Sequence, residues 1–117
     1  MEKKLVITAF VDDRFLGEVI KELKNIITDD RDISVFMDPK FRRSALPSNL
    51  GALRGATTET IHTKLIHLGL ATDLAKEFNA YLKSGGAIVT VECYEENIDE
   101  VIDLLRNEGA INIEVVS

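Results

Sequence analysis

Two stretches of the chain can be laid over one another without a gap: VITAFVDDRFLGEVIKELKN, residues 6–25, and IVTVECYEENIDEVIDLLRN, residues 88–107. Each begins with a run rich in β-branched residues, passes through an acidic turn and ends in an amphipathic pattern. Six positions are identical: Thr8/Thr90, Glu18/Glu100, Val19/Val101, Ile20/Ile102, Leu23/Leu105 and Asn25/Asn107. The overlay predicts a duplicated unit. Convergence of two similar amphipathic patterns is the alternative, and it leads to the same fold.

Each copy is expected to form a strand, a helix and a second strand. Residues 4–11 and 86–93 are predicted strands because of their β-branched and aromatic content, and shorter strands follow at 32–37 and 111–116. The helices between them show apolar residues at helical spacing: Leu16, Val19, Ile20, Leu23, Ile26 and Ile27, then Ile98, Val101, Ile102 and Leu105. Two right-handed βαβ units pack most economically as one four-stranded sheet with both helices on one face. We therefore predict an α+β protein, a ferredoxin-like duplicated βαβ sandwich.

A further pair of helices is expected between the two copies. Thr57 or Thr58 can cap a helix that ends at Gly69, and Thr72 or Asp73 can start a second helix that stops at the glycine pair after residue 84. The prediction is one domain, residues 1–117, with a βαβ unit at 4–37, a loop and helix-pair insertion at 38–84 and a βαβ unit at 86–116.

The two faces of the predicted sheet differ in polarity, because side chains alternate along a strand. Beneath the crossover helices we expect an apolar face formed by Ile7, Ala9, Val11, Val89, Val91 and Cys93. On the opposite face lies an apolar patch too large to leave in water, formed by Val6, Phe10, Phe36 and Ile88. Either the inserted helices or the same face of a second subunit would cover this patch. We favour a homodimer with the patch as its interface and a contribution from the insertion.

The composition, with 45% hydrophobic and 29% charged residues, is that of a soluble globular protein. A net charge of −6 opposes nucleic-acid binding, because affinity for the phosphate backbone depends on Lys and Arg. The apolar runs are far shorter than the roughly 20 residues of a membrane helix, and no signal-peptide cleavage site is evident. A single cysteine permits no intramolecular disulfide. We expect a cytoplasmic protein with neither a nucleic-acid nor a membrane partner.

Basic residues gather in the longest segment without periodicity, DPKFRRSALPSNLGALRGATTET, residues 38–60. Irregular loops of this length are uncommon in compact domains and are often functional. A glycine directly before a helix N-terminus favours anions, because the free N–H groups and the helix dipole attract negative charge. The hypothetical anion site comprises Arg42, Arg43, Arg54, Gly55, Thr57 and Thr58. The simpler interpretation, that the glycine and threonine only start a helix and that the charges are solvated, is more frequent for motifs this short.

No catalytic or metal-binding motif is evident in the sequence. His62 and His67 are five residues apart, roughly 140° around a helix, so they cannot easily share a metal. Cys93 is expected in the core, where desolvation disfavours its thiolate. We predict no enzyme, no metal and no cofactor. A small enzyme with a pocket between sheet and helices is a rival class, for which only Tyr81, Glu92 and His62 are candidates.

Three segments carry a resemblance to a known family: VITAFVDD at 6–13, LGLATDLAKEFNAYLKSGGAIVTVE at 68–92 and IDLLRNEGAINIE at 102–114. This ordering resembles that of small bacterial general-stress or heat-induced proteins. The resemblance implies a ferredoxin-like, stress-associated protein of undefined biochemistry, with no catalytic residues to carry over. The chain departs from the family at residues 38–64, which are polar and basic where many members have a Gly/Ala-rich apolar segment.

These observations predict a non-enzymatic, stress-associated or regulatory protein that acts as a homo-oligomer. The alternative is a small-molecule sensor resembling ACT or PII-like domains, in which the basic loop at residues 40–58 binds an anion or nucleotide.

Overall fold

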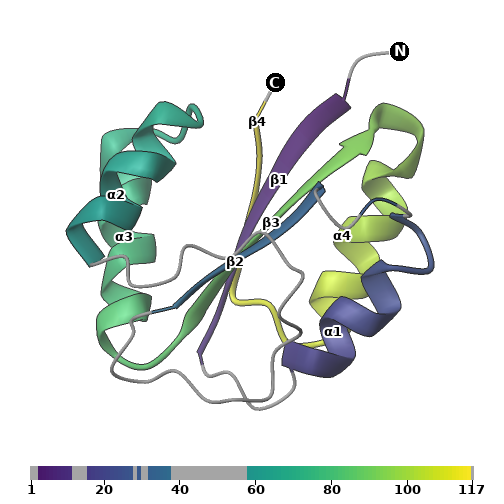
Figure 1. Cartoon of the computed structure of the whole chain (residues 1–117), viewed down its shortest axis with the longest axis horizontal. Helices are drawn as coiled ribbons and strands as arrows, with labels where there is room; N and C mark the ends of the chain where they lie inside the picture. Colours follow the sequence, from purple (N-terminus) through teal and green to yellow (C-terminus); the bar gives the residue numbers. More distant parts are fainter. Residues whose placement is uncertain (1–2, 12–15, 28, 30–31, 38–57, 117) are drawn as a thin grey trace.

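The computed structural model describes residues 3–11, 16–27, 29, 32–37 and 58–116. Its elements are β1 (Lys3–Phe10), α1 (Leu16–Leu23), β2 (Ile33–Met37), α2 (Thr58–His67), α3 (Thr72–Lys83), β3 (Ala87–Tyr94), a 3₁₀ turn η3 (Glu95–Asn97), α4 (Ile98–Asn107) and β4 (Asn112–Val116). The four strands form one sheet (Figure 1). The α+β class and the predicted strands and helices are confirmed.

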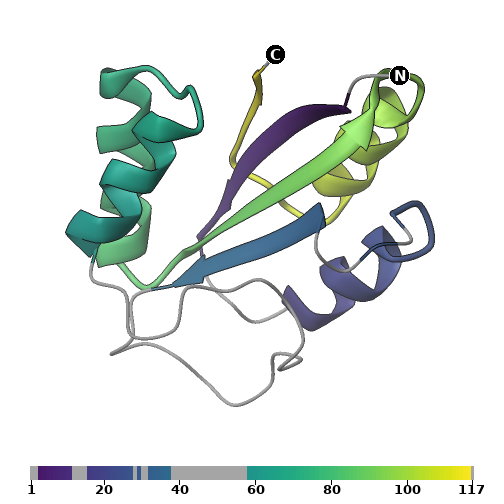
Figure 2. The same cartoon turned by 45° about the horizontal axis from the view of Figure 1, so that its top comes forward.

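The sheet has the order β2-β3-β1-β4, and every neighbouring pair is antiparallel. It follows that β1 and β2 run parallel with β3 between them, and that β3 and β4 run parallel with β1 between them. Helices α1 and α4 connect these parallel pairs and lie side by side on one face of the sheet, whereas α2 and α3 cover the other face (Figures 1 and 2). The sheet is therefore the middle of three layers.

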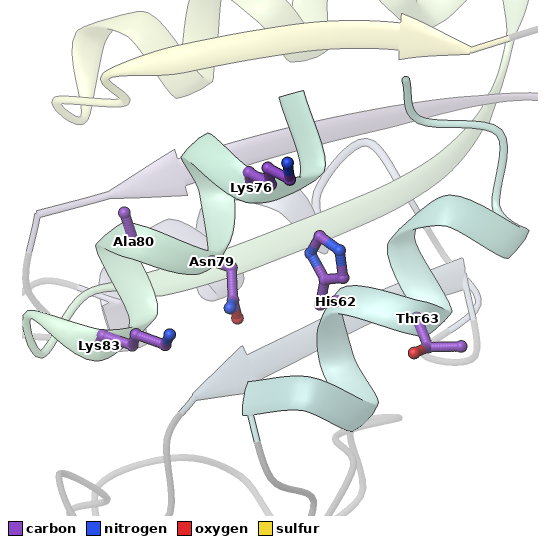
Figure 3. A pocket seen from close by; sticks show the side chains of 6 residues that line it. All are labelled: His62, Thr63, Lys76, Asn79, Ala80 and Lys83. Carbon is purple, nitrogen blue, oxygen red and sulfur yellow. The ribbon is translucent and has the colours of Figure 1, made fainter. Parts of the chain in front are cut away.

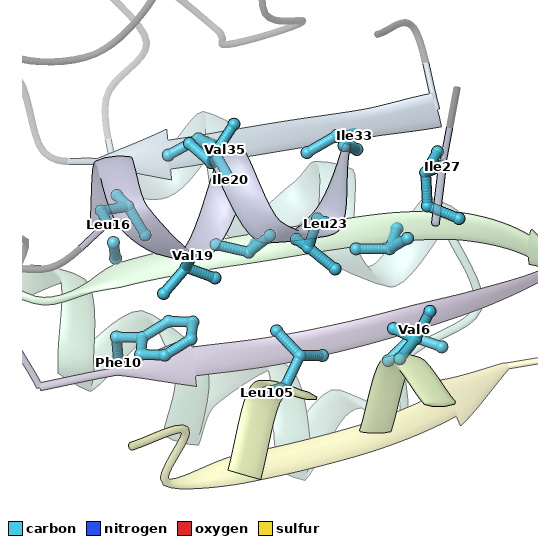
Figure 4. Packing of buried hydrophobic residues seen from close by; sticks show 14 of the residues in the cluster. Val6, Phe10, Leu16, Val19, Ile20, Leu23, Ile27, Ile33, Val35 and Leu105 are labelled. Carbon is cyan, nitrogen blue, oxygen red and sulfur yellow. The ribbon is translucent and has the colours of Figure 1, made fainter. Parts of the chain in front are cut away.

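The layer between the sheet and helices α1 and α4 is closely packed and apolar, and we call it the α1/α4 core (Figure 4). Helix α1 contributes the stripe that its periodicity predicted: Leu16, Val19, Ile20 and Leu23, all buried. The remaining buried members are Val6, Phe10, Ile27, Ile33, Val35, Met37, Ala87, Val89, Val91, Cys93, Val101 and Leu105. In this layer, helix residues spaced three or four positions apart thus pack against alternate residues of the strands.

The second layer, which we call the α2/α3 core, lies between the sheet and the inserted helix pair. Its buried members are Ile7, Ala9, Phe36, Leu65, Leu70, Ala75, Phe78, Leu82 and Ile88. Helix α3 contacts β1 and β3, and α2 packs against α3. The sequence left open whether the inserted helices or a second subunit would cover one face of the sheet. The inserted helices cover this face.

The predicted face of β1 is wrong. Ile7 and Ala9 lie in the α2/α3 core, whereas Val6 and Phe10 lie in the α1/α4 core. Val11 is not in the strand, and its side chain is 61% exposed. A shift of one residue exchanges the two faces of a strand, so a small error in the overlay reverses the whole assignment.

The assignment of β3 is confirmed, and the pairing register shows where the overlay fails. Val91 and Cys93 belong to the α1/α4 core as predicted. Val91 lies opposite Val6 in the register, and residues directly opposite share a face. The helices keep the overlay, because Val19 and Val101 both reach the same core. The gap-free overlay is thus valid for the helices and one residue out of phase for the strands.

The four residues of the hypothetical oligomer interface, Val6, Phe10, Phe36 and Ile88, do not form one surface. All are at most 6% exposed. The first two are covered by α1 and α4, and the other two by α2 and α3. The patch on which the predicted homodimer rested is therefore divided between two cores of the same chain.

Helices α2, α3 and α4 end in the same way, at glycines with positive φ. These residues are Gly69 (φ 107), Gly85 (φ 96) and Gly109 (φ 94). The residue after each glycine donates its N–H to a carbonyl of the last turn, in the pairs Leu70–Leu65, Gly86–Tyr81 and Ala110–Leu105 at 3.1, 2.8 and 3.0 Å. This is the Schellman arrangement, which favours glycine because other residues are strained at such φ. The predicted ends of the two inserted helices are confirmed.

Candidate functional site

A groove of about 410 Å³ lies between α2 and α3, on the outer side of the inserted helix pair (Figure 3). We call it the α2/α3 groove, and its lining residues are His62, Thr63, Lys76, Asn79, Ala80 and Lys83. This volume falls within the roughly 300–1,000 Å³ of small-molecule sites. The groove therefore has room for a small metabolite-sized ligand.

The periodicity of α3 explains why one helix serves both the core and the groove. Its apolar stripe, Ala75, Phe78 and Leu82, is buried against the sheet. Its groove-lining residues are spaced by three or four positions between residues 76 and 83, so they share another face of the helix. Once the apolar face of α3 packs against the sheet, its polar face therefore lies toward α2.

Two buried polar atoms of the groove have no hydrogen-bond partner: His62 Nδ1 and Asn79 Oδ1. Their side chains extend from the two helices into the groove (Figure 3). An unsatisfied buried polar atom costs about 1–3 kcal/mol, and both atoms are enclosed by protein, so a ligand can bond either of them only after the side chain turns. The amide can present either its oxygen or its NH₂ group, and the ring nitrogen can donate or accept according to the tautomer.

The charge of the groove is opposite to that of the whole protein. Lys76 and Lys83 line it, and no Asp or Glu is among the described residues that do, although the chain carries a net charge of −6. The ion pairs Lys3–Asp32 and Lys4–Glu95, both between described residues, include neither groove lysine. The groove therefore offers two ammonium groups to an anionic ligand.

The sequence-predicted anion site in the basic loop falls mostly outside the described residues. This holds for Arg42, Arg43, Arg54, Gly55 and Thr57. Thr58 is the first residue of α2. The loop site stays a prediction.

The candidates for catalysis and metal binding are not brought together. Of the three enzyme candidates only His62 lines the groove. Tyr81 instead packs edge to face on Phe78, with ring centroids 6.4 Å apart and an interplanar angle of 81°, and Glu92 is exposed on β3. Within the ranges that the structure describes, no group of three or more His, Cys, Asp or Glu residues is placed to hold a metal ion.

Cys93 is a core residue, as predicted. Its side chain is 2% exposed in the α1/α4 core. Burial raises the pKa of its thiol, and the negative charge of Asp32 raises the pKa further. The thiol is therefore disfavoured as a nucleophile.

Sequence reasoning missed the lysines and the asparagine of α3. Their spacing at residues 76, 79 and 83 is visible in the sequence, but a polar stripe opposite an apolar one is the ordinary pattern of a solvated helix face. Their pairing with His62 depends on how α2 packs against α3. No local signal could have supplied it.

No family model matches this chain, and no curated protein or solved structure matches it significantly. The resemblance to general-stress proteins therefore stays a prediction. Among the helices that the structure describes, none has the length and apolar character needed to cross a membrane.

Proposed function

We propose that this protein is a ferredoxin-like regulatory domain that binds a small anionic molecule in the α2/α3 groove. The observation that carries the proposal is a groove lined by two lysines and by the polar side chains of His62 and Asn79. The strand order and the placement of α1 and α4 on one face support the ferredoxin-like classification.

The physical basis is charge-assisted hydrogen bonding at a partly enclosed surface. Both lysines are exposed, so each ion pair with a ligand contributes at most about 1 kcal/mol. Lys76 and Lys83 supply the charge, and the polar side chains of His62 and Asn79 line the groove between the two helices. This is the small-molecule sensor predicted as an alternative, with its site moved from the basic loop to the helix pair.

The other parts of the predicted function are carried over as proposals. The non-enzymatic role and the association with stress rest on the sequence and on the family resemblance. The homo-oligomer also stays a prediction, but the buried sheet face no longer supports it. A ligand-binding domain is compatible with each of them.

The experiment that tests the groove is a titration followed by amide chemical shifts in NMR. The probes are inorganic phosphate, glutarate and adenosine monophosphate. We expect at least one of them to move the signals of residues 62–63 and 76–83, and Lys76→Ala or Lys83→Ala to weaken that binding several-fold. The matched control is Lys64→Ala, which removes an exposed lysine of α2 outside the groove lining and should leave binding unchanged.

Two results would overturn this proposal. One is that none of the three probes perturbs the groove signals. The other is that the triple change of Arg42, Arg43 and Arg54 to alanine abolishes binding while Lys76→Ala and Lys83→Ala have no effect. The second result would return the anion site to the basic loop.

A further inference from the structure

We infer that two copies of this chain associate through β4, whose free edge pairs antiparallel with the same edge of the second copy so that the two sheets become one. This inference rests on the homo-oligomer carried over in the proposed function and adds its surface and its register. It is carried by an unpaired strand edge, by exposed apolar side chains on that edge and by a strand sequence that is complementary to itself.

The edge of the sheet at β4 is free and already in place. β4 is the last strand of the sheet and pairs on one side only, with β1 (Figure 2). An edge strand directs a row of backbone N–H and C=O groups away from the sheet, where a further strand can pair with them. Thr8 Oγ1 donates to Asn112 O at 2.7 Å. Ile111 N–H donates to Ala9 O at 2.9 Å. Because these bonds hold β4 on β1, association requires little ordering of the strand.

Exposed apolar side chains distinguish β4 from β2, the strand at the other edge of the sheet. Val115 is 43% exposed, although Val6, directly opposite it on β1, is fully buried. Ile111, which precedes β4, is 40% exposed. The large apolar side chains of β2 are all at most 7% exposed. Apolar surface is therefore available to a partner at the β4 edge and not at the β2 edge.

The sequence of β4 favours one register for a symmetric pair. A twofold axis at Ile113 places Val115 opposite Ile111 of the second copy, so that the exposed apolar residues meet. The same axis places Glu114 opposite Asn112, whose amide can donate a hydrogen bond to the carboxylate. An axis at Glu114 would instead place two carboxylates directly opposite each other, which is destabilising. The charge on the strand thus selects the register centred on Ile113.

Sedimentation velocity over a range of protein concentrations tests the association. The contact is small and each copy carries a net charge of −6, so we expect a reversible dimer that dissociates on dilution and is favoured by added salt. Val115→Lys should leave the protein monomeric, because it places a charge at the apolar contact. The matched control is Ile66→Lys, which makes the same change at an exposed apolar residue of α2 and should not weaken the dimer. Circular dichroism verifies that each variant retains the fold.

Asn112→Lys tests the register. In the register centred on Ile113 it creates two pairs of opposite charge with Glu114, so we expect association about three- to tenfold tighter than that of Ile66→Lys, which changes the net charge equally. Adding Glu114→Lys to this variant should remove the gain, because lysines then face each other. Glu114→Gln alone should bring no comparable gain.

The outcomes separate this inference from the proposed function. A protein that stays monomeric at every concentration overturns both the β4 pair and the homo-oligomer. A dimer that Val115→Lys leaves intact keeps the homo-oligomer and overturns the β4 pair, and one weakened by Ile66→Lys instead would place the interface on α2. A gain from Glu114→Gln as large as that from Asn112→Lys would contradict the register. The groove is tested separately, because the Val115→Lys variant should bind anions as the unaltered protein does.

Discussion

Gly86 shows how one residue fixes the junction of three elements. Its N–H donates to Tyr81 O at 2.8 Å, which closes the end of α3, and the next residue begins β3. A Cβ atom at this position would lie 2.4 Å from Phe10 O and 2.8 Å from Tyr81 O. Both neighbours are backbone atoms, which cannot turn aside as a side chain can. The requirement for glycine here comes from close approach of the backbone.

Gly86→Ala is therefore expected to lower the free energy of unfolding by about 1–3 kcal/mol, because the added methyl forces the end of β1 away from the end of α3. Urea denaturation followed by circular dichroism measures the change. The control is Gly17→Ala in α1, where a Cβ atom meets nothing within 4 Å. That substitution should raise the stability by about 0.5–1 kcal/mol through helix propensity. Similar values for the two variants would contradict the packing argument.

At the scale of elements, the two inserted helices are held unequally. Helix α3 buries Ala75, Phe78 and Leu82 against the sheet. Among the described side chains of α2, only Leu65 is buried. Local opening is easiest where few apolar contacts must break. Over the described side chains, the wall of the groove that carries His62 therefore has fewer buried apolar residues.

We expect the backbone amides of α2 to exchange with deuterium faster than those of α3. Hydrogen exchange measured by NMR compares the two helices in one experiment, and α4 provides a second reference because it buries Val101 and Leu105. Equal protection of α2 and α3 would show that α2 opens only with the whole domain, contrary to this prediction.

Acidic residues meet at the seam between α1 and the end of α4. The pKa of Glu108 is raised above its usual 4.5, first because its carboxyl group shares a hydrogen bond with Glu22, then through desolvation and the charges of Glu22 and Glu18. A carboxyl group whose pKa is higher in the folded than in the unfolded state binds its proton more tightly when folded. Its contribution to stability is present below pH 4.5 and is lost as the pH rises through the raised pKa.

Glu108→Gln should accordingly raise the stability at neutral pH by a few tenths of a kcal/mol, the size of a solvated like-charge contact, because it removes the repulsion from Glu22. Below pH 4.5 this gain should vanish, because the Glu108 carboxyl group, whose pKa is raised, then carries its proton and no longer repels Glu22. Urea denaturation at the two pH values measures the difference. Glu77→Gln on α3 controls for the general effect of removing one negative charge, and an equal gain in that variant would contradict the seam interaction.

At the scale of the whole molecule, the sheet is covered on both faces by helices of the same chain (Figures 1 and 2). Association with a second copy is therefore not needed to bury the sheet. Large apolar side chains that remain exposed in the described ranges are Val11, Ile66, Tyr94, Ile111 and Val115. A homodimer, if it forms, must use a surface other than the predicted patch.

We expect the thermal unfolding midpoint of the Val115→Lys variant to be independent of protein concentration. This variant should not pair through β4, and its fold gains stability with concentration only if folding depends on a partner subunit. Calorimetry over a wide range of concentrations, with sedimentation to measure the oligomeric state, provides the test. A midpoint that rises with concentration would show that a contact between subunits stabilises the fold.

The sequence by itself determined the class of the fold and the position of its elements. The β-branched content of residues 86–93 and the helical spacing in residues 16–23 are local signals, because each follows from the geometry of one element. The glycines that end α2 and α3 are local for the same reason. Burial of Cys93 and of the α1 stripe followed from these patterns.

Only the tertiary structure decided which face of β1 meets which helices, what covers the second face of the sheet, and where the groove lies. An overlay that aligns the helices of the two halves does not reveal that their strands differ in phase by one residue. This difference decides that Val6, and not Ile7, faces α1 and α4. The groove joins His62 to residues at least fourteen positions later, through the packing of α2 on α3. Such contacts depend on how elements approach one another in space, and no periodicity within one element encodes that approach.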